Sequence, residues 1–365
     1  MVLSSTLSWL VDAAAEAAGA DRLLAELGAH LLADGLPLAG GALTLAVPHP
    51  LIARRTWLWR ADSREVIEAL GFAPGAVQES GSPNNAGRRW LATIAAGVVH
   101  EDAIGPKNDG PLLSWIGPRP FTPSEIDNLR QAARFAAAPL AALAARATLT
   151  AALEAYLGRR SAARVLAAPL RRDIGETIQA ALLYADLRGF TALSDNNPPA
   201  VVIAALNTWF DRIAGAVHAF GGEVLKFIGD GVLAIFPVIG GSPRGACDAA
   251  LRAVSAARAG MAHLDEQRLR QGSPALPFGA ALHLGEVLWG NIGAADRLDF
   301  TAIGPAVNLV SRLEGLCKPL RKTVLVSGAL AAETETPLIA LGTHALRGIA
   351  SPCAVFTLPN PASWK

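Results

Sequence analysis

The chain has 365 residues, 52% of them hydrophobic and 17% charged, and its 32 Lys and Arg against 31 Asp and Glu give a formal net charge of +1. At roughly 100–200 residues per domain, this length predicts about two domains, each able to bury its own core. The near-zero charge argues against a nucleic-acid binder, because neutralising many phosphates requires a surplus of Lys and Arg.

The beginning of the chain has no basic region, and Asp12 and Glu16 interrupt its apolar stretch, so we expect no secretory signal. A spanning helix needs roughly 20 consecutive apolar residues. The most apolar stretch, residues 135–145, contains a proline and is flanked by Arg134 and Arg146. We therefore expect a cytoplasmic protein without membrane insertion. Three cysteines fit neither a disulfide framework nor a zinc site, which favours reduced thiols: Cys247, Cys317 and Cys353.

Residues 1–120 are predicted to form a small α+β module. Leucines at helical spacing predict a helix over residues 21–35, with Asp21 as its N-cap and Gly35 just past its end. Further along, the pattern predicts two strands within residues 41–60, a loop over 71–88, and strands over 90–99 and 110–116.

Residues 121–172 are predicted to be a helical connector. Thr122, Pro123 and Glu125 have the spacing of a helix N-terminus with a capping box, and the helical pattern continues to about residue 157, where Pro139 should kink or divide it. Five arginines then favour a solvated helix face, and the balanced total charge weakens the alternative of a nucleic-acid or lipid patch: Arg159, Arg160, Arg164, Arg171 and Arg172.

Residues 173–365 are predicted to form an α+β domain of β-α-β-β-α-β order, the split βαβ pattern of ferredoxin-like sheets. Its strongest local signal is the Gly229-Asp230-Gly231 turn between two apolar strands. The other predicted elements are a strand ending near residue 186 and helices over 198–220, 244–270 and 305–317. Strands are also predicted over 278–283 and 323–326, with a turn and a further strand over 285–292.

Asp186 ends an apolar strand, and Asp230 lies in the hairpin turn 230 − 186 = 44 residues later. This strand order can bring the two carboxylates side by side at the rim of the sheet, next to a glycine-containing loop that opens onto a helix. Such an arrangement suits Mg²⁺ and a polyphosphate. Taken alone, each Asp is more simply explained as a turn or cap residue.

The segment GPAVNLVSR, residues 304–312, begins with a proline that favours a helix, which puts Asn308 and Arg312 on one face. An amide beside a guanidinium could hold a ribose and a phosphoryl group in its transition state. The alternative is an exposed polar helix face.

Four segments together resemble the catalytic domain of class III nucleotidyl cyclases: YADLRGFTALSD, GGEVLKFIGDGVLAIFP, HLGEVLWGNIG and DFTAIGPAVNLVSRLE. The resemblance covers about residues 175–360. It implies a ferredoxin-like palm whose protomers pair head to tail as a homodimer, with the active sites between them.

By this resemblance, Asp186 and Asp230 bind two Mg²⁺ or Mn²⁺ ions, assisted by the Leu187 carbonyl. One ion would activate the ribose 3′-hydroxyl for in-line attack on the α-phosphate, and the other would neutralise the triphosphate and pyrophosphate. The loop residues that would cradle the β- and γ-phosphates with backbone N–H groups are Gly189, Phe190 and Thr191.

The resemblance also assigns Lys226 and Thr301 to the base-selecting pair, which favours ATP over GTP, and Asn308 and Arg312 to the catalytic transition-state pair. Arg347 is the only basic residue where the family often has a further phosphate-binding lysine. Thr301 resembles a subgroup that responds to bicarbonate, so bicarbonate or a small molecule is an expected regulator.

We therefore expect an adenylate cyclase that makes 3′,5′-cyclic AMP and pyrophosphate. The alternatives are a guanylate cyclase and a catalytically silent, nucleotide-sensing dimerisation module. Residues 1–120 resemble a GAF-type sensor, which implies a regulatory region, although a purely structural role in aligning a dimer is equally expected. Its histidines are predicted to be structural or exposed: His30, His49 and His100. Its tryptophans are predicted to fill a core and not to line a pocket: Trp57, Trp59 and Trp90.

Overall fold

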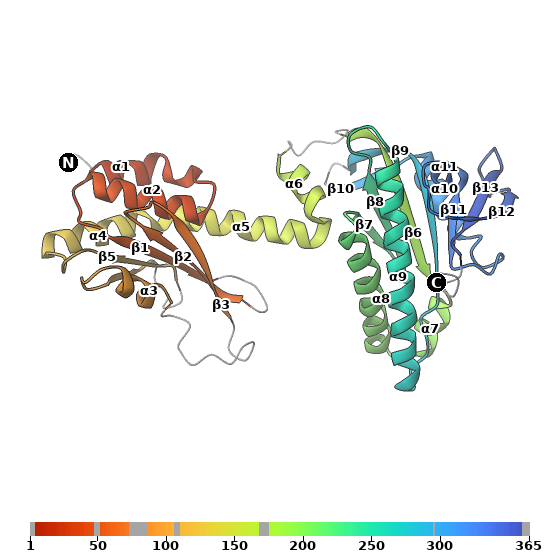
Figure 1. Ribbon diagram of the computed structural model, residues 1–365, viewed down its shortest axis with the longest axis horizontal. Coiled ribbons are helices and arrows are strands. Elements are labelled where there is room, and N and C mark those ends of the chain that lie inside the picture. The colour runs from red at the N-terminus through yellow and green to blue at the C-terminus, as the bar shows by residue number, and fades with distance from the viewer. Residues whose placement is uncertain are drawn as a thin grey trace. The chain divides into compact units, whose positions relative to one another are not determined.

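The computed structural model describes residues 4–46, 52–72, 86–105, 110–167, 175–294 and 296–359. The chain divides into two compact units, Met1–Ala151 and Ala152–Lys365 (Figure 1). The boundary falls inside one helix, α5 (Ala137–Leu157).

The first unit is built on a five-stranded antiparallel sheet of order β3-β2-β1-β5-β4. Helices α1, α2, α4 and the beginning of α5 bury a leucine-rich core against one face, and α3 covers the other (Figure 1). The elements are α1 (Ser5–Asp12), a 3₁₀ turn (Ala14–Glu16), α2 (Ala20–Ala33), β1 (Gly40–Ala46), β2 (Ile52–Arg60), β3 (Val66–Phe72), α3 (Ala86–Ile94), β4 (His100–Ala103), β5 (Leu112–Ile116) and α4 (Pro123–Phe135).

Several predictions for this unit are confirmed. Strands β1, β2 and β5 lie where the alternating patterns placed them, and Gly35 lies past the end of α2 with a φ of +91°. The N-cap of α2 is Gly19, however, and Asp21 lies in its first turn. Trp59 is buried against Trp115, and Trp57 and Trp90 pack against the two cores. The expected role of these tryptophans in the core is therefore confirmed.

The strand predicted over residues 90–99 is wrong, because residues 86–94 form α3. Gly87 and Leu91 are its buried residues, and their four-residue spacing is the helical period. Strand β3 and helix α1 had no prediction. Of the predicted loop over 71–88, residues 73–85 lie outside the described residues, whereas 71–72 end β3 and 86–88 begin α3. His49 also lies outside the described residues, and the GAF-type assignment stays a prediction.

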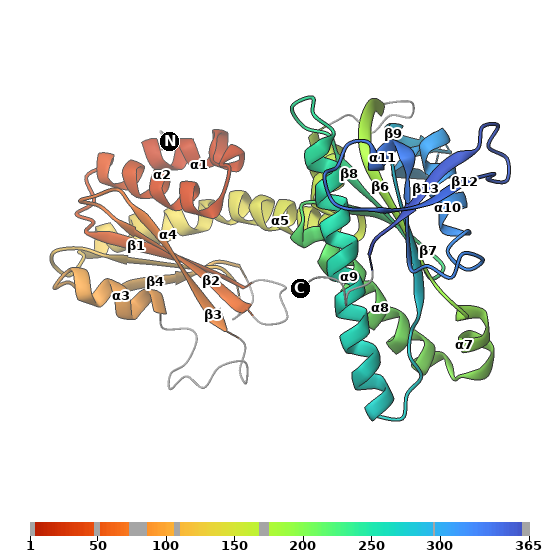
Figure 2. The same cartoon turned by 45° about the vertical axis from the view of Figure 1, so that its right-hand side comes forward.

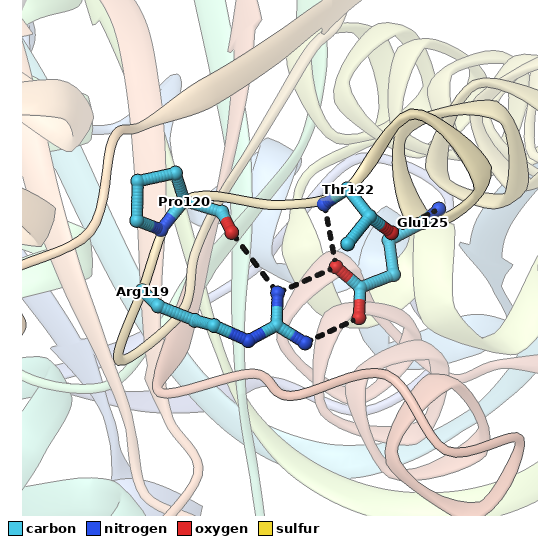
Figure 3. A network of polar contacts seen from close by, with 4 residues as sticks. All are labelled: Arg119, Pro120, Thr122 and Glu125. Atoms are coloured by element: carbon cyan, nitrogen blue, oxygen red, sulfur yellow. Dashed lines mark hydrogen bonds and ion pairs between the residues drawn. The ribbon is translucent and has the colours of Figure 1, made fainter.

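The start of the connector has the predicted capping box (Figure 3). The Glu125 N–H donates to Thr122 Oγ1 at 3.3 Å, and the Thr122 N–H donates to Glu125 Oε2 at 2.7 Å. Arg119 adds a two-armed ion pair to Glu125, and its hydrogen bond is the main cause that lowers the pKa of Glu125 to about 2. The predicted division also occurs: α4 ends at Phe135 and α5 begins at Ala137, two residues before Pro139.

Two helical stretches are long and apolar enough to span a membrane by length and composition alone, Pro123–Leu157 and Pro199–Ala219. Core helices of other proteins pass the same test, and both stretches contribute buried side chains here, such as Leu140 and Trp209. The cytoplasmic location without membrane insertion stays a prediction.

The second unit is an eight-stranded sheet of order β12-β13-β11-β9-β6-β8-β7, with β10 paired to β9. Its antiparallel core order, β9-β6-β8-β7, is the one that the predicted β-α-β-β-α-β pattern requires. Helices α8 and α9 lie side by side on one face, and α10 packs on the other (Figure 2). The elements are α6 (Arg159–Ala167), β6 (Gly175–Leu187), α7 (Phe190–Asn196), α8 (Pro199–Ala219), β7 (Glu223–Ile228), β8 (Gly231–Pro237), α9 (Arg244–Arg270), β9 (Phe278–Gly293), β10 (Leu298–Ile303), α10 (Pro305–Glu314), β11 (Val324–Ser327), α11 (Gly328–Ala331), β12 (Ile339–His344) and β13 (Cys353–Thr357).

One prediction for this unit is wrong. The two strands expected over 278–283 and 285–292 are a single strand, β9, because its sixteen residues pair continuously with β6 and then with β10. Gly285 is needed there for space, since a Cβ would lie 2.6 Å from the Ala306 Cβ, so this glycine marks close packing and not a turn.

The arginines that follow the connector helix and the three cysteines can now be placed in the structure. Arg159 and Arg160 are exposed, Arg164 pairs with Glu176 at 3.0 Å, and Arg171 and Arg172 lie outside the described residues. All three cysteines are free, and burial raises the pKa of both Cys247 and Cys317 to about 12, which keeps these thiols protonated.

Candidate active site

Two aspartates from distant parts of the sequence meet at one edge of the second sheet. Asp186 is the second-to-last residue of β6, and Asp230 lies in the turn between β7 and β8. Their side chains lie within hydrogen-bonding reach of each other. The turn is anchored from α8, where the Trp209 Nε1–H donates to the Asp230 carbonyl at 2.8 Å. The pairing of these two carboxylates, predicted from the strand order, is therefore present.

The environment of this pair disfavours two negative charges. The pKa of Asp186 is raised from 3.8 to about 7, first by burial, then by the side chain and charge of Asp230, and then by the charge of Glu314. The Leu187 N–H, which donates to the Asp186 carboxylate, opposes this shift only partly. A divalent cation between the carboxylates would relieve the repulsion, and oxygen donors of this kind suit Mg²⁺ or Mn²⁺.

A tight loop leads from Asp186 into α7. Leu187 is buried, and Gly189 is the N-cap of α7 with a φ of +76°, a conformation that favours glycine. Phe190 and Thr191 begin the helix, so their N–H groups have no acceptor within it. The Arg188 N–H donates to the Pro277 carbonyl at 2.7 Å, which fixes the loop against the segment before β9.

The direct partner of Lys226 is a residue that sequence reasoning did not single out. Lys226 Nζ forms an ion pair with Asp299 on β10. Thr301 follows two residues later on the same side of the strand and is buried. Strand β7 has a register shift between Val224 and Lys226, which places an extra residue opposite β8 just before the lysine.

Helix α10 presents the second predicted pair. Its first residue is Pro305, and Asn308 and Arg312 are both exposed one turn apart. In the described part of the chain Arg312 has no ion pair, so its guanidinium is available to an anion. Arg347 is exposed between β12 and β13. The Asn308–Arg312 pair and the Asp186–Asp230 pair lie on different elements. The first pair is on α10, and the second is formed by the end of β6 and the turn between β7 and β8.

Sequence reasoning missed several residues around the aspartates. Trp209 lies in the helix predicted over residues 198–220, and Arg188, Asp299 and Glu314 lie in the segments that resemble the cyclases, but the sequence pattern gives none of the four a role. Asp299 precedes Thr301 by two positions, and Glu314 follows Arg312 by two. A period of two along a strand could have placed Asp299 with Thr301, but no local pattern shows that Glu314 reaches back across the sheet.

The first comparison with known proteins concerns residues of the second unit. Residues 174–341 match the profile of the adenylate and guanylate cyclase catalytic domain. The adenylate cyclase of Anabaena cylindrica is 31% identical over 160 residues, which cover 43% of this chain and 31% of that protein. Adenylate cyclase 1 of Rhizobium meliloti is 32% identical over 153 residues, which cover 42% of this chain and 23% of that protein.

A solved bacterial light-regulated adenylyl cyclase superposes with a TM-score of 0.51 at 22% identity, covering 71% of this chain and 85% of its own, a likeness of fold alone. Residues 174–341, within the second unit, are therefore similar in sequence to the catalytic domain of adenylate and guanylate cyclases. The match spans less than a third of the length of either curated relative.

Proposed function

We propose that this protein is an adenylate cyclase that converts ATP into 3′,5′-cyclic AMP and pyrophosphate. The observation that carries the proposal is the half-buried Asp186–Asp230 pair, in which burial and mutual repulsion favour a cation between the carboxylates. A nucleoside triphosphate brings four negative charges, and a cation site at the rim of a sheet suits it.

The residues present fit two Mg²⁺ or Mn²⁺ ions. Asp186 and Asp230 would hold them, with the Leu187 carbonyl as a further oxygen donor. Within the described residues no group of three or more His, Cys, Asp and Glu side chains is placed to hold a metal ion, so phosphate oxygens would complete the coordination. When bound, the ions would lower the pKa of the ribose 3′-hydroxyl and neutralise the phosphates.

The other residues of the chain bind and orient the substrate. Backbone N–H groups of Gly189, Phe190 and Thr191 would hold the β- and γ-phosphates. Asn308 would orient the ribose for in-line attack on the α-phosphate, and Arg312 would stabilise the charge that develops on the phosphoryl oxygens. Arg347 would add a further positive charge near the phosphates.

Lys226 and Thr301 would select the base. An ammonium donates to a ring nitrogen of adenine, and a hydroxyl can both donate to and accept from the adenine edge. The ion pair with Asp299 holds the Lys226 ammonium at the side of β10 that carries Thr301, which supports ATP. The alternatives are a guanylate cyclase, which a lysine at this place disfavours, and a silent nucleotide-sensing dimer, which the retained aspartates disfavour.

The active sites would form in a homodimer. Asp186 and Asp230 of one protomer would meet Lys226, Thr301, Asn308 and Arg312 of its partner. Large apolar side chains stay exposed on α8 and at the end of β7, next to the Asp230 turn, which supports a second copy covering them. These side chains are Val201, Ile203, Phe227 and Ile228.

The function is tested by incubating the purified protein with ATP or GTP, in Mg²⁺ or Mn²⁺, and measuring cyclic nucleotide. We expect the yield of cyclic AMP from ATP to be in clear excess over the yield of cyclic GMP from GTP. Asp186→Asn should remove both activities. A preference for GTP would support the guanylate cyclase alternative, and no product from either nucleotide would support the silent module. Parallel reactions with bicarbonate test that regulator.

The shared site is tested by mixing two inactive proteins, Asp230→Ala and Arg312→Ala. A heterodimer restores one working site, because one protomer supplies both aspartates and the other supplies Arg312. Recovery of activity on mixing is the expected result. If the mixture stays as inactive as its components, the two sets of residues act within one protomer.

The first unit would be a regulatory region, either through a small ligand or by aligning the dimer. A truncated chain that begins at Ala152 keeps α6 and all proposed site residues. We expect its basal activity and its dimerisation to differ from those of the full chain. Equal values in both measurements would show that residues 1–151 have no regulatory role.

A further inference from the structure

Glu314 lies close to the proposed cation site but has no assigned role. It is the last residue of α10, and its carboxylate lies against β9 at Gly279, where an added Cβ would be 2.2 Å from Glu314 Oε1. Gly279 is the residue of β9 that pairs with Asp186 of β6. The glycine therefore leaves room for a third carboxylate beside the Asp186 position.

This placement is unfavourable for stability. The C-terminal end of a helix carries a partial negative charge, and Glu314 adds a full negative charge there. Burial, followed by the charge of Asp230, raises the pKa of Glu314, while Arg188 opposes the shift. Arg312 is two residues away and thus roughly 200° around the helix, so it does not neutralise Glu314. A residue that breaks several local rules at once is expected at a functional site.

Arg188 supplies the only compensating charge found at this place among the described residues. Its Nη2 donates to the Lys322 carbonyl, and its Nε is buried with no hydrogen-bond partner in the described part of the chain. When all are ionised, three carboxylates and one guanidinium leave two net negative charges, which favours divalent cations at this place.

We propose that Glu314 is a positioning residue of the Asp186–Asp230 cation site, where its carboxylate strengthens the field that retains a divalent cation without binding the ion itself. The inference rests on the proposed function, because it assumes a cation at the two aspartates. Arg188 limits the repulsion among the three carboxylates when the cation is absent. Outer residues of this kind typically change metal affinity by about 10- to 100-fold.

The test is a titration of the full-length, chelator-treated protein with Mn²⁺ in the absence of nucleotide, with free Mn²⁺ measured by electron paramagnetic resonance. Glu314→Gln should raise the Kd about 10-fold, and it should leave the Tm of the metal-free protein equal or higher. A purely structural glutamate would instead lower the Tm and leave the Kd unchanged. The matched control is Glu286→Gln, an exposed acid on the same strand as Gly279, which should change neither quantity.

The Asp186→Asn variant distinguishes a failure of the proposed cation site from a failure of the proposed role of Glu314. If it keeps the Kd of the wild type, the cation site of the proposed function is wrong. If it loses Mn²⁺ binding while Glu314→Gln binds within twofold of the wild type, only the role of Glu314 is wrong. Arg188→Gln gives an independent result should Glu314→Gln not fold. Removal of the positive charge should tighten Mn²⁺ binding, and weaker or unchanged binding overturns the proposal.

Discussion

The contact between α6 and the edge strand β7 gives a sharp prediction about stability. Glu223 begins β7 and is 3% exposed, and its Oε1 accepts from the Ser161 N–H at 2.9 Å and from the Ser161 hydroxyl at 2.6 Å. Its Oε2 is buried without a partner among the described residues. Gly158, with a φ of +83°, precedes α6, and a Cβ there would lie 2.8 Å from Glu223 Oε1. Glu223 thus satisfies the N-terminus of α6 from another element.

The expected change in the free energy of unfolding depends on which buried groups lose their hydrogen-bond partners in each variant. Glu223→Ala leaves two buried donors of Ser161 unsatisfied, at about 1–3 kcal/mol each, and removes one unsatisfied oxygen, so the net loss is about 1–4 kcal/mol. Ser161→Ala removes one hydrogen bond to a charged group, about 1.5–3 kcal/mol. Glu223→Gln keeps an oxygen that accepts from Ser161, so we expect the free energy of unfolding to change by at most about 1 kcal/mol. The variant loses a buried negative charge, which is favourable, but also the attraction of that charge to the N-terminus of α6, which is unfavourable.

The assay is urea unfolding of the full chain together with hydrogen exchange of peptides from residues 159–167. Glu223→Ala should lower the unfolding midpoint of the second unit and speed exchange in α6, whereas Glu223→Gln should change both little. The reasoning is refuted if Gln is as destabilising as Ala, which would make the charge and not the acceptor responsible. Unchanged exchange in α6 with Ala would also refute it.

Four further predictions follow from the site. Because the pKa of Asp186 is raised to about 7 from 3.8, protonation stabilises the metal-free fold at low pH, and this contribution is lost as the pH rises through about 7. A cation must displace that proton, so the apparent Kd for Mn²⁺ should rise by about tenfold per pH unit below 7 and stay level above it; a level profile from pH 5.5 to 8.5 would contradict this. Asp299→Asn releases Lys226 from a partly exposed ion pair of about 0.2–1 kcal/mol, so steady-state kinetics should show the KM for ATP raised up to about fivefold with a smaller change in kcat. Gly279→Ala forces its Cβ onto Glu314 Oε1 and should cost about 1–3 kcal/mol in thermal unfolding, a cost that Glu314→Ala relieves in the double variant. Arg312→Ala should lower kcat by about 10²–10³, and near-normal turnover would remove it from the transition state.

The sequence predicted the second unit better than the first for a physical reason. Its strands and helices carry strong periodic signals, and the Gly229-Asp230-Gly231 turn fixes a hairpin locally, so the meeting of Asp186 with Asp230 followed from strand order. In the first unit, residues 90–99 are apolar apart from Thr93, which makes strand and helix hard to distinguish without the tertiary contacts of Gly87 and Leu91.

The residues that support the site could not be predicted in this way. Glu314 reaches Gly279 across 35 sequence positions, and Glu223 reaches Ser161 across 62. Such contacts depend on how helices pack on the sheet, and no short-range pattern encodes them. The same holds for β9, where Gly285 suggested a turn because its close approach to Ala306 is visible only in three dimensions.

The register shift in β7 also limits how this protein can change during evolution. Val224 pairs with Ala234 and Lys226 with Leu233, so Leu225 is an added residue that fills the core while the lysine next to it faces Asp299. Substitution at position 226 leaves this register intact, so the base preference that we propose for Lys226 is open to single-residue change. Deletion of Leu225 would shift the pairing of Lys226 with β8 by one position, and it would also displace the turn that contains Asp230. Insertions and deletions should thus be rare in β7 among active relatives, even where the residue at 226 varies.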